Sequence, residues 1–301
     1  QKAVKNVNEK IADRLLGMDA SNQRSIDNAM LALDGTKNKK RLGANAILAV
    51  SLATARAAAF SSGLPLYEYL RKAFDLKYDN WRMPVPTMNI LNGGLHGGNG
   101  ISIQEFMIVP QHKKLAERVR IGSEIFHALK AILKKKNFGV GVGDEGGFAP
   151  RLKNNEEALK LIMQAIVAAK YKPGKDVMLA MDIAASEFYK NEKYYFEGKK
   201  GISAKALIEI LKKWIKKYPF VSIEDPLAED DWQNWANFTG KVNATLRLVG
   251  DDLFVTNVER LQKGIDQGVG SAILIKVNQI GTLSETIDTI LLAQKNNYAV
   301  S

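Results

Sequence analysis

Apolar positions in the first 78 residues follow helical spacing, and we find no convincing strand there. The pattern predicts helices within 3–18, 19–35, 42–63 and 65–74. The second should begin at a capping residue, Asp19 or Ser21, and stop at Gly35. The stretch 42–60, "LGANAILAVSLATARAAAF", is rich in alanine but interrupted by polar residues, which favours a buried helix over a membrane span. The chain therefore opens with a helical region.

The pattern changes beyond the prolines Pro84 and Pro86, where short apolar strands begin to alternate with helices. Such alternation indicates a parallel sheet covered by helices. The repeat is short and regular: from residue 224 to 251 is 27 positions, and from 251 to 276 is 25. This spacing favours a closed α/β barrel over an open sheet. We predict two domains, 1–78 and 79–301.

Charged residues fall at the ends of three of these apolar strands. Asp182 ends "LAMD", Glu224 ends "VSIE", and Asp251 follows "LVG". In a parallel barrel the carboxyl ends of the strands meet on one face, where active sites are built. Carboxylates brought together repel one another unless a cation lies among them, and oxygen ligands suit Mg²⁺. Each residue alone also fits a helix N-cap, and Asp225 and Asp252 fit capping or supporting roles better than metal binding.

Two further groups are unusual for their surroundings. Lys276 interrupts the apolar run "AILIK", where burial and a nearby metal would favour the neutral amine, a proton acceptor. The alternative is an ammonium paired with a carboxylate. Glu145 lies in the glycine-rich stretch "GVGDEGGFAP", which is either a surface turn or a tight loop holding an acid away from water.

Composition narrows the function classes. The 301 residues carry a net charge of +11, but the lysines of "KKWIKK" (212–217) fit the wet face of an amphipathic helix, and no aromatic-rich strand accompanies the basic runs. We therefore expect no nucleic-acid binding. With no cysteine there is neither a thiolate metal site nor a cysteine nucleophile. No secretory signal or membrane span is visible in the sequence.

Six motifs in order resemble the enolase family, which interconverts 2-phosphoglycerate and phosphoenolpyruvate in glycolysis. They are "VPTMNILNGGLHGGNGISIQEFMIVP", "GVGDEGGFAP", "LAMDIAASEFY", "SIEDPLAEDDW", "VGDDLFVTN" and "LIKVNQIGTLSET". The likeness extends over the whole chain and implies a TIM-like (β/α)8 barrel, preceded by the helical part of an α+β N-terminal domain. It also implies a Mg²⁺-dependent carbon–oxygen lyase.

The resemblance also assigns roles by position. It implies that Asp182, Glu224 and Asp251 hold Mg²⁺, with Asp251 near the substrate, and that Lys276 is the base and Glu145 the acid. Further substrate contacts carried over are His96, Gln104 and Glu105. The family pattern has strands before residue 1, and a phosphate-binding His-Arg-Ser run and further strands after residue 301. From these differences we expect a chain trimmed at both ends, without the last barrel strand.

The family resemblance predicts a cytoplasmic homodimer or octamer. Two alternatives remain. Another member of the superfamily, such as an acid-sugar dehydratase, would be separated by a substrate screen. Enolases also occur at cell surfaces as plasminogen-binding proteins, a role that the lysine-rich surface allows without indicating it.

Overall fold

A computed structural model describes residues 1–77, 80–198 and 200–301. The chain forms two compact units by its internal contacts. Unit 1 contains Gln1–Trp81, Phe254–Lys263 and Ile273–Ser301, and unit 2 contains Arg82–Leu253 and Gly264–Ala272. Each unit therefore takes residues from separate parts of the sequence.

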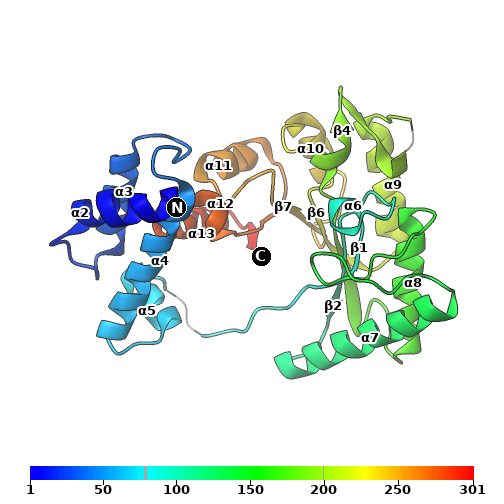
Figure 1. Cartoon of the computed structure of the whole chain (residues 1–301). Helices are drawn as coiled ribbons and strands as arrows, with labels where there is room; N and C mark the ends of the chain where they lie inside the picture. The colour runs from blue at the N-terminus through cyan, green and yellow to red at the C-terminus, as the bar shows by residue number, and fades with distance from the viewer. Residues whose placement is uncertain (78–79, 199) are drawn as a thin grey trace. The chain divides into compact units, whose positions relative to one another are not determined.

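Every element of unit 1 within residues 1–77 is helical, as predicted (Figure 1). The helix predicted from Asp19 or Ser21 instead begins after Asn22, because the Asn22 side chain accepts the backbone N–H of Ser25 at 3.1 Å. It ends at Gly35, whose φ of +64° suits a left-handed C-cap. The elements are α1 (Lys2–Lys5), a π-helix (Asn6–Ile11), α2 (Ala12–Leu15), α3 (Gln23–Asp34), α4 (Ala44–Ser61) and α5 (Leu66–Ala73).

Helix α4 joins the two hydrophobic clusters of unit 1. Its first half contributes Ala46 and Ile47 to one cluster, and its second half contributes Ala55, Ala58 and Ala59 to the other. By length and composition α4 also qualifies as a membrane span, with a mean hydropathy of 1.3, but core helices pass the same test. Its contribution to both clusters agrees with the predicted buried helix.

The second cluster of unit 1 is completed by residues from the end of the chain. Leu283 and Ile287 of α13 (Leu283–Lys295) pack with the α4 alanines and with Tyr69 and Phe74. The preceding elements are α11 (Val258–Gln267) and the short α12 (Val277–Ile280), and β9 (Ala299–Val300) follows α13. Figure 1 shows α13 beside the helices of the N-terminal region, an arrangement that sequence patterns did not predict.

The central sheet has the strand order β1-β2-β3-β6-β7-β8-β9. The parallel arrangement predicted from the alternation is correct for β3, β6 and β7 and wrong for β2, which runs antiparallel to both β1 and β3. The order has two ends, so the described strands do not close a barrel. The strands are β1 (Met88–Asn92), β2 (Glu105–Pro110), β3 (Val177–Asp182), β6 (Phe220–Glu224), β7 (Arg247–Gly250) and β8 (Ala272–Ile273).

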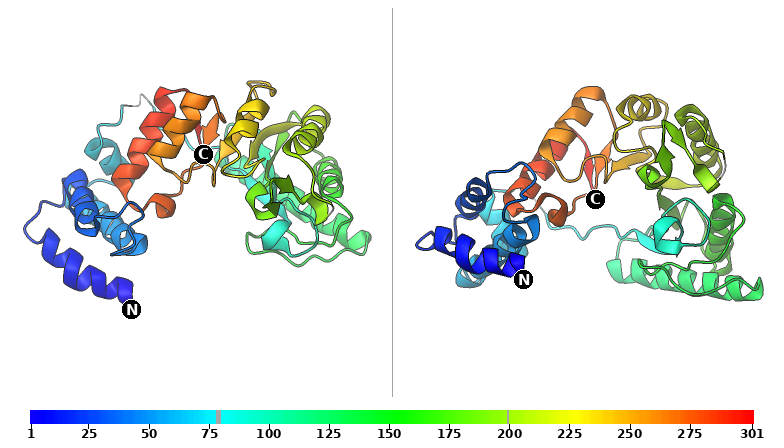
Figure 2. Two further views of the ribbon diagram at one scale, coloured as in Figure 1. Left: turned by 90° about the horizontal axis from the view of Figure 1, so that it is seen from above. Right: turned by 45° about the horizontal axis from the view of Figure 1, so that its top comes forward.

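Helices α7 (Leu115–Lys135) and α8 (Asn155–Ala168) of unit 2 lie side by side (Figure 2). The other elements of this unit include α6 (Gly94–Gly97), α9 (Ala204–Lys217) and α10 (Trp232–Thr239). A small hairpin of β4 (Tyr189–Lys190) and β5 (Lys193–Tyr194) lies between two 3-10 turns, η2 (Ala185–Phe188) and η3 (Phe196–Gly198).

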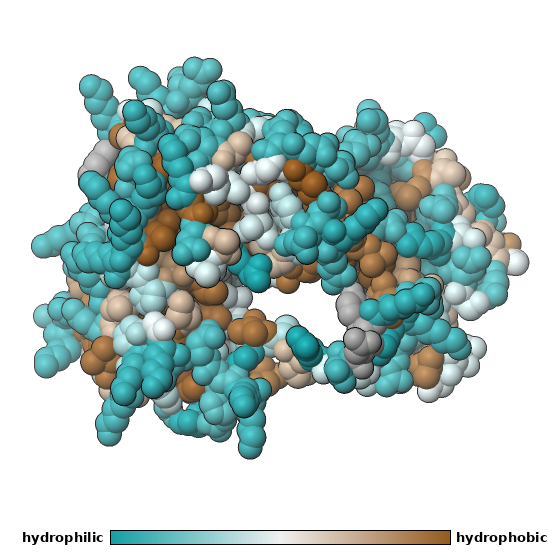
Figure 3. Space-filling view, turned by 180° about the vertical axis from the view of Figure 1, so that it is seen from behind, coloured by the Kyte–Doolittle hydropathy of each residue, from teal (hydrophilic) through white to brown (hydrophobic). Residues whose placement is uncertain are grey.

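Helix α9 has the amphipathic character predicted for it. Leu207, Ile208 and Leu211 are buried, whereas Lys213 and Lys216 are exposed. Much of the molecular face drawn in Figure 3 is likewise hydrophilic. These lysines of the basic run "KKWIKK" therefore lie on a solvated helix face, as the spacing predicted.

Candidate active site

Three neighbouring strands of unit 2 present a carboxylate at the same level of the sheet. Glu105, the first residue of β2, pairs with Asp182 at the end of β3, and Asp182 pairs with Glu224 at the end of β6. Side chains at paired positions lie on the same face of a sheet. Because β2 is antiparallel, its beginning lies beside the ends of β3 and β6. The structure therefore brings together three of the predicted site residues.

These carboxylates, together with those following β6 and β7, make a concentrated negative charge. Burial, first, and then four neighbouring carboxylates raise the pKa of Glu224 well above its usual range; the neighbours are Asp182, Asp225, Asp251 and Glu105. Asp182 is 5% exposed and Asp251 6% exposed. Several carboxylates buried close together favour the binding of a cation among them.

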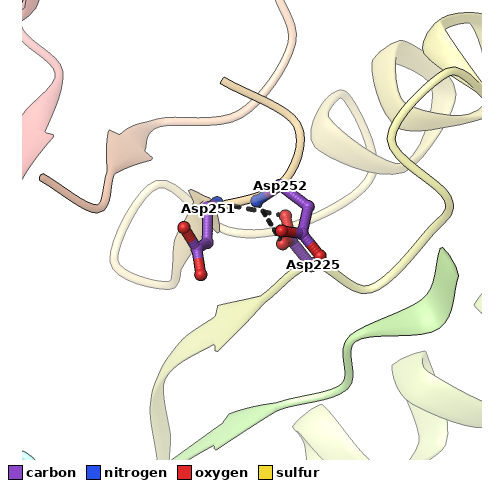
Figure 4. A group of neighbouring side chains, drawn as sticks. All are labelled: Asp225, Asp251 and Asp252. Atoms are coloured by element: carbon purple, nitrogen blue, oxygen red, sulfur yellow. Dashed lines mark hydrogen bonds between the residues drawn. The ribbon is translucent and has the colours of Figure 1, made fainter. Parts of the chain in front are cut away.

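Asp225 supports the loop that carries Asp251. Its two carboxylate oxygens accept the backbone N–H groups of Asp251 at 3.1 Å and Asp252 at 2.7 Å (Figure 4). Burial and then the charge of Asp182 raise the pKa of Asp225 well above its usual range. Its backbone φ is +38°, a left-handed value that costs energy outside glycine. These contacts match the supporting role predicted for Asp225.

The predicted metal ligands differ from the tightest acidic group among the described residues. That group is Asp225, Asp251 and Asp252, in which the candidate oxygen atoms all lie within 4.8 Å of one another. Only Asp251 belongs to both sets. Since Asp225 already accepts backbone N–H groups from the other two residues, the close spacing has a structural explanation that needs no ion.

Gln104 contacts the row of carboxylates directly. Its Nε2 donates to Oδ2 of Asp182 at 3.1 Å, and its backbone N–H donates to the Asp182 carbonyl at 3.1 Å. The other Asp182 oxygen, Oδ1, accepts the N–H of Ala184 at 2.9 Å. The Asp182 carboxylate is thereby held in one orientation.

The glycine loop that carries Glu145 is packed closely against β1. A Cβ on Gly147 would lie 2.7 Å from both Oδ1 of Asn92 and the backbone N of Leu91, distances that no side chain tolerates. Asn92 is fully buried, and its Oδ1 accepts the N–H of Gly147 at 2.9 Å. Close approach therefore requires glycine at position 147, whereas an added Cβ at Gly139, Gly141 or Gly146 would meet no atom within 4 Å.

Water is not excluded from Glu145 in this structure, contrary to the expectation of an acid held away from solvent. Its side chain is 36% exposed, and its neighbours Asp144 and Gly146 are exposed as well. Nε2 of His96, on α6, lies 3.7 Å from Oε1 of Glu145. Among the described residues, the buried Nδ1 of His96 has no hydrogen-bond partner. Two more predicted site residues are thus neighbours.

Lys276 belongs to unit 1, and its setting differs from the prediction. The expected strand 271–278 is only two residues long, and Lys276 is an exposed N-cap residue before α12. Beyond β8 the backbone N–H of Ile275 still donates to the carbonyl of Ser301 at 3.0 Å, whereas the Lys276 backbone N–H donates to a side chain, Oγ1 of Thr256, at 2.9 Å. Thr256 is fully buried with φ at +53°, an outlier for a β-branched residue.

Sequence reasoning missed the residues that connect these parts. Asn92 joins the Glu145 loop to the carboxylate row, since its Nδ2 donates to the carbonyl of Gln104 at 3.3 Å while its Oδ1 holds Gly147. The only available signal was its place before the glycine pair in "LNGG". Asn99 adds to the same region, with its Nδ2 donating to the carbonyls of Asn92 and Pro150.

The donor set fits a hard divalent cation. All the side chains gathered at the ends of β3, β6 and β7 offer carboxylate oxygens, the ligands that Mg²⁺, Ca²⁺ and Mn²⁺ prefer. Burial and then repulsion by the neighbouring carboxylates raise the pKa of Glu224, and a bound cation would relieve the repulsion.

Known proteins resemble this chain over nearly its full length. Residues 80–301 match the family model "Enolase, C-terminal TIM barrel domain", and residues 1–70 match "Enolase, N-terminal domain". A protein named enolase from Elusimicrobium minutum (strain Pei191) is 54% identical over 299 residues, which cover 99% of this chain and 70% of that protein. This chain belongs to the enolase family. The resemblance read from the six motifs is confirmed.

Membership of the enolase family also confirms the expected fold class and reaction. The fold is the α/β barrel of the family with an N-terminal domain before it, and the function is that of a phosphopyruvate hydratase, a lyase. An enolase requires a divalent metal cofactor, and the acidic cluster is compatible with one. Its substrates are 2-phosphoglycerate and phosphoenolpyruvate.

Proposed function

We propose that Asp182, Glu224 and Asp251 bind Mg²⁺, and that this site performs the enolase reaction with Lys276 as base and Glu145 as acid. The observation that carries the metal site is the strand register, which places Glu105, Asp182 and Glu224 side by side. A proton next to a carboxylate is very weakly acidic, since its removal adds charge to an anion. Bound Mg²⁺ would supply positive charge to offset that increase.

Two protein groups handle the protons in this proposal. The neutral amine of Lys276 takes the proton from the carbon next to the substrate carboxylate, and the electron pair left behind forms the double bond as the C–O bond breaks. Glu145 gives its proton to the departing hydroxide, which leaves as water. His96, 3.7 Å from Glu145, together with Gln104 and Glu105, would contact and orient the substrate.

Support for these roles comes from neighbouring contacts. Gln104 holds the orientation of Asp182, and Asp225 holds the backbone that carries Asp251. The backbone of Lys276 is held by Thr256. Fixed orientation of ligands and reacting groups is what a metal site and a proton transfer both require.

The test is formation of phosphoenolpyruvate from 2-phosphoglycerate by the full chain, followed by ultraviolet absorbance with Mg²⁺ and with a chelator. We expect turnover that depends on Mg²⁺ and disappears in Lys276→Ala. The matched control is Lys295→Ala, at the exposed end of α13. Equal turnover in Lys276→Ala and Lys295→Ala would remove Lys276 from the mechanism.

We also propose domain limits of 1–78 and 79–301, supported by family matches that end at residue 70 and resume at residue 80. A cytoplasmic homodimer or octamer is proposed from the family alone, and sedimentation analysis would test the assembly. Plasminogen binding at a cell surface stays a prediction, because the lysines of α9 already have a structural explanation.

A further inference from the structure

A short segment without helix or strand structure, residues 101–103, leads into Gln104 and Glu105. Its backbone is held by one side chain: Oδ1 of Asn155 accepts the N–H groups of Ser102 and Ile103, each at 3.0 Å. Asn155 is the first residue of α8 and is 0% exposed. A buried amide that accepts two backbone N–H groups fixes the position of the segment.

Asn155 is itself oriented by Glu197, from the turn η3. Oε1 of Glu197 accepts both the backbone N–H of Asn155, at 2.8 Å, and its side-chain Nδ2, at 3.2 Å. An ionised carboxylate only accepts hydrogen bonds, so it selects the amide orientation that turns Nδ2 toward Glu197 and Oδ1 toward the segment. The order of contacts is thus Glu197 to Asn155 to the segment.

A third contact closes the ring. The backbone N–H of Glu197 donates to the hydroxyl oxygen of Ser102 at 2.5 Å. Glu197 has a φ of +60° and interrupts η3. A residue other than glycine persists in that region when its surroundings hold it there, and such residues gather at functional sites.

The segment that this ring holds is the one that positions two site residues. Immediately after Ile103, Gln104 makes two hydrogen bonds to Asp182, and Glu105 pairs with Asp182 in the sheet. A displacement of Ser102 and Ile103 would shift both residues against the β3 carboxylate. Neither Asn155 nor Glu197 belongs to the carboxylate row.

We propose that Asn155 and Glu197 are positioning residues of the enolase site, which act through residues 101–103 to hold Gln104 and Glu105 against Asp182. This inference rests on the substrate-contact roles proposed above for Gln104 and Glu105. The turn η3, which carries Glu197, thereby takes part in the reaction without touching substrate.

The experiment compares three variants of the full chain by kcat and KM for 2-phosphoglycerate at saturating Mg²⁺. Glu197→Ala removes the acceptor, and we expect kcat/KM to fall at least 10-fold, since small misplacements of reacting groups can cost up to about 100-fold. Glu197→Gln keeps a side-chain oxygen at the same place, and we expect it to restore most of the loss. The matched control is Glu192→Ala, at an exposed residue of the hairpin that precedes η3, and it should stay within 2-fold of the parent.

A double mutant separates positioning from general destabilisation. If Glu197 acts through Gln104, Glu197→Ala should cause little further loss of kcat/KM in a Gln104→Ala background. Independent losses that multiply would overturn the proposal, as would a Glu197→Ala enzyme equal to Glu192→Ala. Should Glu197→Ala not fold, Ser102→Ala opens the same ring by removing one hydroxyl, and a smaller loss of kcat/KM is expected. An unchanged kcat/KM in that variant would equally overturn the proposal.

The result is distinguishable from a failure of the proposed function. Inactive Lys276→Ala with normal kcat/KM in Glu197→Ala would overturn the positioning role and leave the proposed roles in place. Active Lys276→Ala would instead overturn the proposed base, whatever the Glu197 variants show.

Discussion

Gln104 is joined to Asp182 by two hydrogen bonds, one from its side chain and one from its backbone N–H. The backbone bond would survive a change of the side chain, so the two contributions can be separated. The side-chain bond orients the Asp182 carboxylate together with the Ala184 N–H, which donates to its other oxygen.

Replacing Gln104 by alanine should therefore weaken metal binding while leaving the fold intact. Loss of a group that orients a metal ligand typically costs about 10- to 100-fold in affinity. The measurement is the Mg²⁺ concentration for half-maximal activity, together with calorimetric titration without substrate. Gln111→Ala, beyond the other end of β2, is the control, and equal Mg²⁺ affinities of the two variants would contradict the expectation.

Gly147→Ala should displace the loop that carries Glu145. The added methyl group would lie 2.7 Å from Oδ1 of Asn92 and from the backbone of Leu91, so the loop must move outward. We expect a destabilisation of about 1–3 kcal/mol, typical of forced overpacking, and a lower kcat. Urea unfolding and steady-state kinetics measure the two effects. Gly139→Ala meets no atom within 4 Å and should change neither.

Thr256→Val should affect Lys276, the proposed base, more than the rest of the candidate site. The substitution keeps the shape but removes the hydroxyl that accepts the backbone N–H of Lys276. We expect slower exchange of the substrate's carbon-bound proton with solvent, followed by NMR in deuterated water, and a lower kcat. Thr256→Ser, which keeps the hydroxyl, should exchange faster than the valine variant. Equal exchange rates in both would show that the hydroxyl has no such role.

Asp34 should make the helical region sensitive to acid. Burial raises the pKa of Asp34, but hydrogen bonds from the Thr36 hydroxyl and from the N–H groups of Leu42, Thr36 and Arg41 outweigh it, so the pKa lies below its usual value. A lowered pKa means that the ionised form favours the folded state. Its stabilisation is complete above about pH 4, the ordinary value for Asp, and is lost as the pH falls further.

Asp34→Asn should accordingly lower the free energy of unfolding at pH 7 by about 1–3 kcal/mol, the cost of leaving buried donors poorly satisfied. The difference from the parent should shrink as the pH approaches 3. Chemical unfolding at several pH values measures it, with Asp13→Asn on the exposed face of α2 as control. A difference that stays constant with pH would contradict the role of the charge.

Much of the candidate site could be predicted because its charged residues interrupt or end runs of apolar residues in the sequence. Asp182 and Glu224 end apolar strands, and Gly147 lies in a glycine-rich loop, so local sequence was informative at each. The direction of β2 was not predicted, because an amphipathic strand has the same pattern in either direction. Asn92, Asn155 and Glu197 were missed for another reason: their partners are 12–95 residues away, and single polar residues carry no periodic signal.

The prediction for Lys276 shows in a different way what a pattern of apolar residues fails to predict. The apolar run "AILI" indicated a full strand, yet β8 ends at Ile273, a single backbone hydrogen bond from Ile275 to the carbonyl of Ser301 follows, and the backbone of Lys276 bonds to a side chain. The strand propensity of an amino acid is a property of that residue alone and does not include hydrogen-bond partners elsewhere in the chain. The backbone N–H of Lys276 is bound by a buried hydroxyl 20 residues away, a partner that such a preference does not indicate.

The reversed direction of β2 has a consequence for how many segments of the chain reach the site. In a uniformly parallel barrel each strand adds one connection to the catalytic rim. Here β1 ends and β2 begins at that rim, so the link between them lies there. After α7 the chain comes back to the same rim in the Glu145 loop, where Phe148 pairs with Leu91. Two tightly held segments thus reach the rim from a stretch where one would be usual, and both carry proposed site residues: Gln104 follows the first, and Glu145 lies in the second.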